Sequence, residues 1–245
     1  MKNISILGSG WLGLPLALEL AKTNNIKLST TTASKKRDLI AKNITPYIVN
    51  TNDTNDEIKE ILNCNTLIIN IPSKDIKAFE ILIKKIEKQN IKDIIFVSST
   101  SAYNNPKSPL GNIEELFLSL QKINTTILRF GGLIGYSRNP ANFFKNGKVV
   151  KNSHSSVNMI HRDDCIAIIK KVLESDIKNE IFNCCSPSHP TKKEFYTYCA
   201  NTSNLAIPNF DSSDEESNAR IISSDKLISK LKYKFIHDDL MKVRF

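Results

Sequence analysis

The stretch that decides the fold lies at residues 4–13 and reads Ile4-Ser5-Ile6-Leu7-Gly8-Ser9-Gly10-Trp11-Leu12-Gly13. Its first part predicts a buried strand, and its second part is a Gly-x-Gly-x-x-Gly turn. Without a Cβ, Gly8 permits a tight turn, Gly10 admits a pyrophosphate to the backbone, and Gly13 allows a helix to pack closely. The helix-forming run from Leu14 to Lys22 supplies that helix, whose first N–H groups face the phosphates. We therefore predict a dinucleotide site that contains Gly8, Ser9, Gly10, Trp11, Leu12 and Gly13.

The composition indicates a soluble globular protein with room for a full core. The chain has 245 residues, of which 40% are apolar and 24% are charged. It shows no secretory signal and no stretch of membrane-spanning length, so we expect a cytoplasmic protein without a membrane partner. No Cys-x-x-Cys pair or dense cysteine scaffold is present, which predicts reduced thiols at Cys64, Cys165, Cys184, Cys185 and Cys199.

The net charge of +9 raises nucleic acid as a partner. The basic pairs, such as Lys84-Lys85 and Lys170-Lys171, are however scattered along the chain without interleaved aromatic residues. A solvated lysine surface explains this charge better. We therefore expect a small-molecule substrate rather than a nucleic acid, and a monomer or a homodimer.

The end of the predicted second strand, residues 27–32, selects between two cofactors. An acidic residue there would accept hydrogen bonds from the adenine ribose of NAD, whereas the 2′-phosphate of NADP needs hydroxyl and cationic partners. The first acid after this strand is Asp38. Hydroxyl and cationic residues precede it, and we predict that they contact NADP, with NAD as the other possibility: Thr31, Ser34, Lys35 and Arg37.

Strands and helices alternate through the following hundred residues or so. Further strands are expected at residues 47–50, 66–72, 93–97 and 125–130, with helices at 56–62 and 75–89 between them. This alternation implies right-handed crossovers and a parallel sheet, hence a Rossmann-type doubly wound α/β fold. The strand at 66–72 ends at Pro72, where a cofactor crosses the sheet edge, so Ile71 and Pro72 join the predicted cofactor contacts.

Four stretches carry a more specific resemblance, and they occur in order at residues 98–103, 128–135, 158–164 and 223–233. They read Ser98-Ser99-Thr100-Ser101-Ala102-Tyr103, Leu128-Arg129-Phe130-Gly131-Gly132-Leu133-Ile134-Gly135, Asn158-Met159-Ile160-His161-Arg162-Asp163-Asp164, and Ser223-Ser224-Asp225-Lys226-Leu227 through Leu231-Lys232-Tyr233. The chain thus resembles the extended or atypical branch of the short-chain dehydrogenase/reductase superfamily, which includes NAD(P)-dependent sugar epimerases and dehydratases. The resemblance covers nearly the whole chain.

The resemblance implies roles for three residues. Ser99 would hydrogen-bond the reacting carbonyl or hydroxyl and stabilise charge that develops beside the nicotinamide. Ser98 and Gly131 would contact the cofactor, Gly131 near its nicotinamide end. The alternative for residues 98–101 is that their hydroxyls satisfy N–H groups of the following loop.

The chain departs from the family at the pair that performs acid–base catalysis. The family uses a Tyr-x-x-x-Lys pair on the next helix, in which the lysine lowers the tyrosine pKa. Leu128 comes 29 residues after Ser99, no tyrosine lies between Tyr103 and Leu128, and about twenty residues of the family pattern are missing. The letters of the motif do occur at Tyr103 and Lys107, but Pro106 and two asparagines favour a turn over a helix.

Three charged residues that follow Lys107 are expected to have structural roles. Glu114 and Glu115 are expected to begin a helix that runs to Gln121 and to complement its dipole. We interpret Arg129 as an ion partner.

The C-terminal half is expected to combine a substrate lobe with a return to the sheet. We predict a Rossmann core at 1–135 and a mixed segment at 136–245, which forms a small lobe and returns one strand (181–184) and one helix to the core. Asp163 or Asp164 and Thr191 are expected to cap helices, and 211–218 is expected to be a mobile loop. His161 is interpreted as a packing residue, since the other histidines show no metal-ligand spacing with it, so no metal site is predicted.

Three functions remain open. The first is an NAD(P)-dependent oxidoreductase, epimerase or dehydratase-like enzyme acting on a small polar, sugar-like or nucleotide-sugar substrate. The second is a sensor or regulatory protein that kept the NADP(H) site and lost catalysis. The third is a nucleotide-sugar or hydroxy-acid dehydrogenase with an all-helical second domain. The stretch Gly13-Leu14-Pro15-Leu16-Ala17 resembles the corresponding stretch of these enzymes. The serine-rich stretch at 98–103 and the short C-terminal half argue against it.

Overall fold

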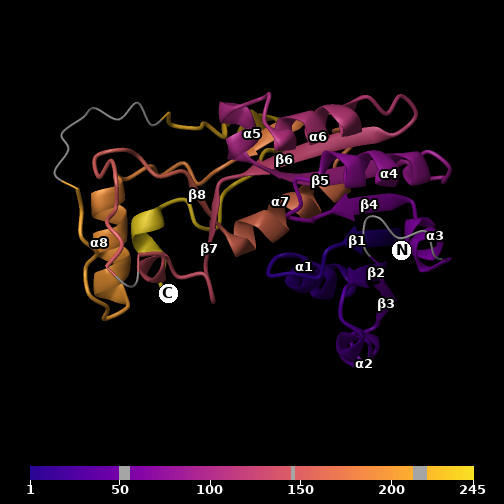
Figure 1. Cartoon of the computed structure of the whole chain (residues 1–245), viewed down its shortest axis with the longest axis horizontal. Coiled ribbons are helices and arrows are strands. Elements are labelled where there is room, and N and C mark those ends of the chain that lie inside the picture. Colours follow the sequence, from indigo (N-terminus) through magenta and orange to yellow (C-terminus); the bar gives the residue numbers. More distant parts are fainter. Residues whose placement is uncertain (50–55, 145–146, 212–219) are drawn as a thin grey trace. The chain divides into compact units, whose positions relative to one another are not determined.

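The computed structural model describes residues 1–49, 56–144, 147–211 and 220–245. A seven-stranded sheet has the order β3-β2-β1-β4-β5-β6-β9, and neighbouring strands from β3 to β5 pair in parallel. Figure 1 labels β1 to β6 of this sheet. The strands are β1 (Asn3–Leu7), β2 (Asn25–Thr30), β3 (Ile44–Ile48), β4 (Thr66–Ile69), β5 (Asp93–Ser99), β6 (Asn124–Phe130) and β9 (Ile181–Cys184). This order confirms the predicted Rossmann-type α/β fold.

Apolar runs without alternation place the central strands between two layers. All four residues of β4 are buried, which is typical of a parallel strand covered on both faces. On one side, three aromatic side chains from α4 (Ile76–Ile86), β5 and α6 (Pro109–Leu118) pack together. The ring centroid of Phe79 lies 5.9 Å from that of Phe96 and 5.8 Å from that of Phe117. Figure 1 shows α4 and α6 side by side along these strands.

Seven further α-helices lie in the described part of the chain. They are α1 (Gly13–Leu20), α2 (Lys36–Ile40), α3 (Asp56–Leu62), α5 (Thr100–Asn104), α7 (Arg162–Glu174), α8 (Lys192–Thr202) and α9 (Asp225–Leu231). The helix predicted at 56–62 and the strand predicted at 181–184 are confirmed. The strand predicted at 47–50 instead begins at Ile44, because Ile44 to Ile48 pair with β2. Asn50 and the predicted loop from Ser212 onward lie outside the described residues.

The chain divides into two compact units, residues 1–129 with 169–182 and residues 130–168 with 183–245. The second unit contains two paired parallel strands, β7 (Gly132–Ile134) and β8 (Met159–His161). Its apolar core includes Ile134, Val150 and Phe195. A strand pair in this unit contradicts the all-helical second domain of the third functional reading.

Candidate functional site

The glycine turn after β1 is built by two contacts that only glycine permits. Gly8 has φ +107°, and a Cβ there would collide with the carbonyl oxygen of Asn70. A Cβ on Gly13 would collide with the carbonyl oxygen of Gly8. For Gly10, in contrast, no atom of the described residues beyond its chain neighbours lies within 4 Å of the place a Cβ would occupy. Two glycines therefore close the turn, and the third leaves open space beside its backbone.

Hydrogen bonds align the carboxyl ends of three neighbouring strands, β1, β2 and β4, at this turn. The backbone N–H of Gly8 donates to Ser29 Oγ of β2 at 2.7 Å. The N–H of Asn70, which directly follows β4, donates to the Leu7 carbonyl of β1 at 2.8 Å. Leu7 and Ile69 are register partners, so β1 and β4 end side by side.

A cavity of ≈ 330 Å³ opens at these strand ends. Its lining comes from the last two residues of β2, from residues that follow β1, β2, β3 and β4, and from Lys35: Gly8, Ser9, Gly10, Ser29, Thr30, Thr31, Lys35, Val49, Asn70, Ile71 and Pro72. The strand order reverses between β1 and β4, and open α/β sheets bind ligands at the carboxyl end of such a reversal. The cavity therefore occupies the position where the fold class binds its ligands.

About half of the residues predicted to contact a cofactor line this cavity. They are Gly8, Ser9, Gly10, Thr31, Lys35, Ile71 and Pro72. Other predicted residues lie elsewhere: Leu12 and Gly13 are buried against the sheet, and Ser34 and Arg37 are exposed in and beside α2. Gly131 belongs to the second unit, where its N–H donates to the Cys184 carbonyl at 3.0 Å. Trp11 and Ser98 are not among the lining residues described.

Four cavity residues are not indicated by the sequence motifs: Ser29, Thr30, Val49 and Asn70. Ser29 and Thr30 belong to the predicted second strand, but their place at its end was fixed only by pairing with β1. Asn70 lies within the apolar run that predicts a strand at 66–72, but β4 ends at Ile69. A single asparagine near the end of an apolar run is a sign that the strand has ended and a loop has begun.

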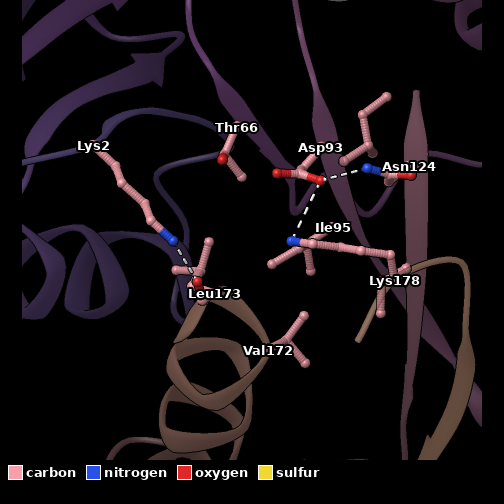
Figure 2. A pocket seen from close by; sticks show the side chains of 10 residues that line it. Lys2, Thr66, Asp93, Ile95, Asn124, Val172, Leu173 and Lys178 are labelled. Carbon is pink, nitrogen blue, oxygen red and sulfur yellow. Dashed lines mark hydrogen bonds and ion pairs between the residues drawn. The ribbon is translucent and has the colours of Figure 1, made fainter. Parts of the chain in front are cut away.

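The opposite edge of the sheet offers a contrast. A second cavity lies at the amino ends of β4, β5 and β6 and has a volume of ≈ 10 Å³. Figure 2 shows the side chains that line it. Lys2 Nζ donates to the Leu173 carbonyl at 2.6 Å, and Asp93 accepts from Asn124 at 3.0 Å and pairs with Lys178 at 3.3 Å (Figure 2). A space of this size holds about one water molecule. This cavity therefore has no room for a cofactor, and its polar side chains are paired with one another or with the backbone.

A buried ion pair lies next to the serine stretch. Arg129 Nη2 of β6 lies 2.5 Å from Glu114 Oε2, and Arg129 Nε lies 3.0 Å from both carboxylate oxygens. Ser98 Oγ donates to the same carboxylate at 2.5 Å, and the Glu114 side chain is 2% exposed. The interpretation of Arg129 as an ion partner is confirmed. The role predicted for Glu114 is wrong, because α6 begins at Pro109 and places this residue inside the helix.

Ser99 ends β5 and caps the helix that follows. Its Oγ accepts a hydrogen bond from the Ser101 N–H at 3.2 Å, as N-cap of α5. The side chain is half-buried. This contact is the alternative expected for the strand-end hydroxyls, although it leaves the Ser99 Oγ proton available to a ligand.

Tyr103 and Lys107 do not share a helix. Tyr103 lies in α5, which ends at Asn104. Lys107 is exposed in the turn that precedes Ser108, the N-cap of α6. The turn predicted from Pro106 is present, and the helical i, i+4 spacing that would hold a lysine against the tyrosine is not available here. The guanidinium of Arg129 lies 5.9 Å from the centroid of the Tyr103 ring.

In the second unit, Asp164 holds a returning segment rather than capping α7. Its side chain is fully buried and accepts from Tyr233 Oη at 2.7 Å and from the N–H groups of Ile236 at 2.7 Å and His237 at 3.0 Å. Burial and the hydrogen bond to Asp164 raise the pKa of Tyr233. The capping role predicted for Asp163 or Asp164 is wrong, because α7 begins at Arg162 and both acids lie in its first turn.

The same segment brings His237 against His161, a contact that no motif in the sequence indicates. The two ring centroids lie 3.9 Å apart, and Asp163 Oδ2 lies 3.3 Å from His161 Nδ1 and 3.3 Å from His237 Nε2. Burial and the neighbouring His237 lower the pKa of His161. Burial opposes ionisation of Asp163, but hydrogen bonds from Tyr136 and His237 outweigh it, so its pKa is lowered.

The cysteines agree with the prediction of reduced thiols. All five are free and buried. Burial raises the pKa of both Cys185 and Cys199 to about 12, so these thiols are neutral and unreactive at physiological pH. None of the helices in the described part of the chain combines the length and apolar character that crossing a membrane requires.

Comparisons with known proteins agree with the fold. No family model matches the chain. The chain is 28% identical to Protein YeeZ of Escherichia coli K12 over 268 aligned positions, covering 98% of this chain and 97% of that protein. It superposes on UDP-glucose 4-epimerase of Thermotoga maritima, solved with UDP-glucose, with a TM-score of 0.77, 16% identity and coverage of 98% and 96%. For UDP-glucuronic acid 4-epimerase of Bacillus cereus, solved with UDP-glucuronic acid and NAD, the TM-score is 0.75 at 16% identity, covering 94% and 93%. The chain thus has the fold of nucleotide-sugar epimerases.

Proposed function

We propose that this chain binds a nicotinamide dinucleotide and uses it in an oxidoreductase, epimerase or dehydratase-like reaction on a small polar substrate, with a nucleotide sugar as the class to test first. The cavity at the Gly8–Gly10 turn carries the proposal, because it lies at the reversal of strand order and presents open backbone at Gly10. Solved structures of the same fold hold NAD and UDP-sugars. The second unit, residues 130–168 with 183–245, would then supply the substrate lobe.

NADP is the proposed cofactor form. Thr31 and Lys35 line the cavity next to the end of β2, where the adenine ribose of a dinucleotide would lie, and no acidic residue is among the described lining residues. A lysine ammonium favours a 2′-phosphate over a free ribose hydroxyl.

The variant Lys35→Ala tests this preference. We expect it to weaken NADPH binding about tenfold and to leave NADH binding nearly unchanged, since one charge-assisted hydrogen bond to phosphate is lost. Fluorescence titration with both nucleotides measures the two affinities. Lys42→Ala is the matched control, because Lys42 is exposed and is not among the lining residues described. Equal loss of NADPH and NADH affinity, or no loss of either, would contradict the assignment.

Ser99 is the proposed catalytic residue, placed at the carboxyl end of β5. With a panel of carbonyl compounds and nucleotide sugars, turnover is followed by nicotinamide absorbance, and by product analysis where the cofactor is regenerated within a cycle. We expect Ser99→Ala to abolish turnover and spare NADPH binding, whereas Ser99→Thr retains the hydroxyl and the helix cap. The exposed neighbour Ser101→Ala is the control. Turnover that survives in Ser99→Ala would show that another group orients the substrate.

A second function is favoured by one observation, the separation of Tyr103 and Lys107 by the end of α5. A chain without a tyrosine–lysine pair on one helix lacks the usual general acid or base of the resembled family. It would then act as an NADP(H)-binding sensor or regulatory protein. Cofactor binding without turnover over the whole substrate panel would favour this alternative, and failure to bind either nucleotide would exclude both functions.

A further inference from the structure

Three side chains of the second unit converge on one point outside the cofactor cavity. Candidate ligand atoms of His161, Asp163 and His237 all lie within 4.8 Å of one another. Asp163 Oδ2 lies 3.3 Å from His161 Nδ1 and 3.3 Å from His237 Nε2. In a tetrahedral site with bonds of about 2.0–2.1 Å, neighbouring ligand atoms lie about 3.3 Å apart. Both spacings therefore already suit a bound ion.

Hydrogen bonds tie the segment that carries His237 to the helix that carries Asp163, although the two residues lie 74 positions apart in the sequence. His237 donates its N–H to Asp164 Oδ2 at 3.0 Å and accepts from Ser186 Oγ at its carbonyl at 3.1 Å. Tyr233 and Ile236 bind the other oxygen of the same buried carboxylate. The segment that carries His237 is thus tied to the start of α7, which carries Asp163, so this part of the ligand set is preorganised.

The surroundings also orient His161 and the Asp163 carboxylate. Gly135, with φ +106°, leaves room for the imidazole of His161, because a Cβ at this position would collide with the ring. Tyr136 Oη donates to Asp163 Oδ1 at 2.8 Å and leaves Oδ2 to face the two imidazoles. A hydrogen bond to the second oxygen of a ligating carboxylate is the usual way in which outer residues orient a metal ligand.

We propose that His161, Asp163 and His237 form a binding site for a divalent transition-metal ion, with Zn²⁺ as the ion to test first. Two imidazole nitrogens and one carboxylate oxygen suit Zn²⁺ better than Mg²⁺ or Ca²⁺, which take oxygen ligands. The side chains of Asp163 and His237 are 34% and 26% exposed, so the ion can enter from solvent. Three protein ligands leave a fourth position for water or an anion.

Calorimetric titration of the untagged, chelator-treated full chain with ZnCl₂ tests the proposal. We expect one Zn²⁺ ion per chain, and visible absorption bands of tetrahedral coordination when Co²⁺ replaces it. His237→Ala and Asp163→Asn should each weaken binding about a hundredfold, and Tyr136→Phe about tenfold, the order of an outer-residue effect. His154→Ala, at an exposed histidine, is the control and should leave binding unchanged.

Circular dichroism of every variant separates lost ligands from lost folding. Asp163→Asn and Tyr136→Phe preserve side-chain size, so they remain informative even where His237→Ala unfolds. Absence of stoichiometric Zn²⁺ binding in the wild type overturns the proposal, and so does a Zn²⁺ affinity that is unchanged in folded Asp163→Asn. The proposal is independent of NADP binding, because no residue of the triad lines the cofactor cavity.

Discussion

Residues near the edge of the sheet fall into two groups. Some shape the cavity, and others have polar groups that are already hydrogen-bonded within the protein. Gly10 presents open backbone, and Lys35 lines the cavity with an exposed ammonium group. Ser98, although adjacent to Ser99 in sequence, donates its hydroxyl to Glu114 inside a buried ion pair. A serine motif therefore does not identify ligand contacts by itself, because neighbouring hydroxyls of one strand point to opposite faces.

The ion pair between Glu114 and Arg129 yields a stability prediction. Arg129→Met should lower the free energy of unfolding by about 3 kcal/mol, since it leaves a carboxylate buried without its charge partner. The double variant Glu114→Leu with Arg129→Met should cost clearly less than the sum of the single changes. Urea unfolding measures both. A loss below about 1 kcal/mol in Arg129→Met, or strict additivity, would show that the pair does not hold β6 against α6.

The helices show where a local pattern suffices and where it misleads. Thr191 was predicted as an N-cap and forms a full capping box with Glu194 at the start of α8. The acidic pair Glu114-Glu115 predicts a start of α6 that is too late in the chain, whereas Ser108 and Pro109, a cap followed by proline, mark the observed start. The starts of α6 and α8 are therefore marked by capping residues rather than by acidic residues of the first turn.

Loss of the capping box should weaken α8. Thr191→Ala is expected to lower the free energy of unfolding by about 1 kcal/mol, because the Glu194 N–H loses its partner. Thr191→Ser should restore most of this loss by retaining the hydroxyl. The midpoint of urea unfolding, followed by circular dichroism, distinguishes the two. Equal midpoints for the alanine and serine variants would argue against the cap.

At the scale of the whole molecule, the sheet and the glycine turn can be predicted from the sequence, whereas contacts between segments distant in the sequence cannot. Alternating apolar runs and helix patterns predict the parallel sheet because each crossover is local. The meeting of His237 with Asp163 joins residues 74 positions apart, and Asp164 creates it by binding the backbone of the returning segment. No periodicity or spacing in the sequence encodes that juxtaposition. Seven of the cavity residues could be predicted, three from the glycine turn and four from the ends of the second strand and of the strand at 66–72 and the residues after them. Strand ends of a parallel sheet meet at one edge, which brings these segments together.

The central claim is that the cavity beside Gly10 binds a nicotinamide dinucleotide. Calorimetric titration of the wild type and of Gly10→Val with NADPH tests it most directly. The new side chain meets no described atom within 4 Å at its Cβ, so it should fill the cavity without disturbing the fold. We predict one NADPH bound per wild-type chain and at least about tenfold weaker binding in Gly10→Val with unchanged circular dichroism. Equal affinity in the two proteins, or absence of binding in the wild type, would contradict the account.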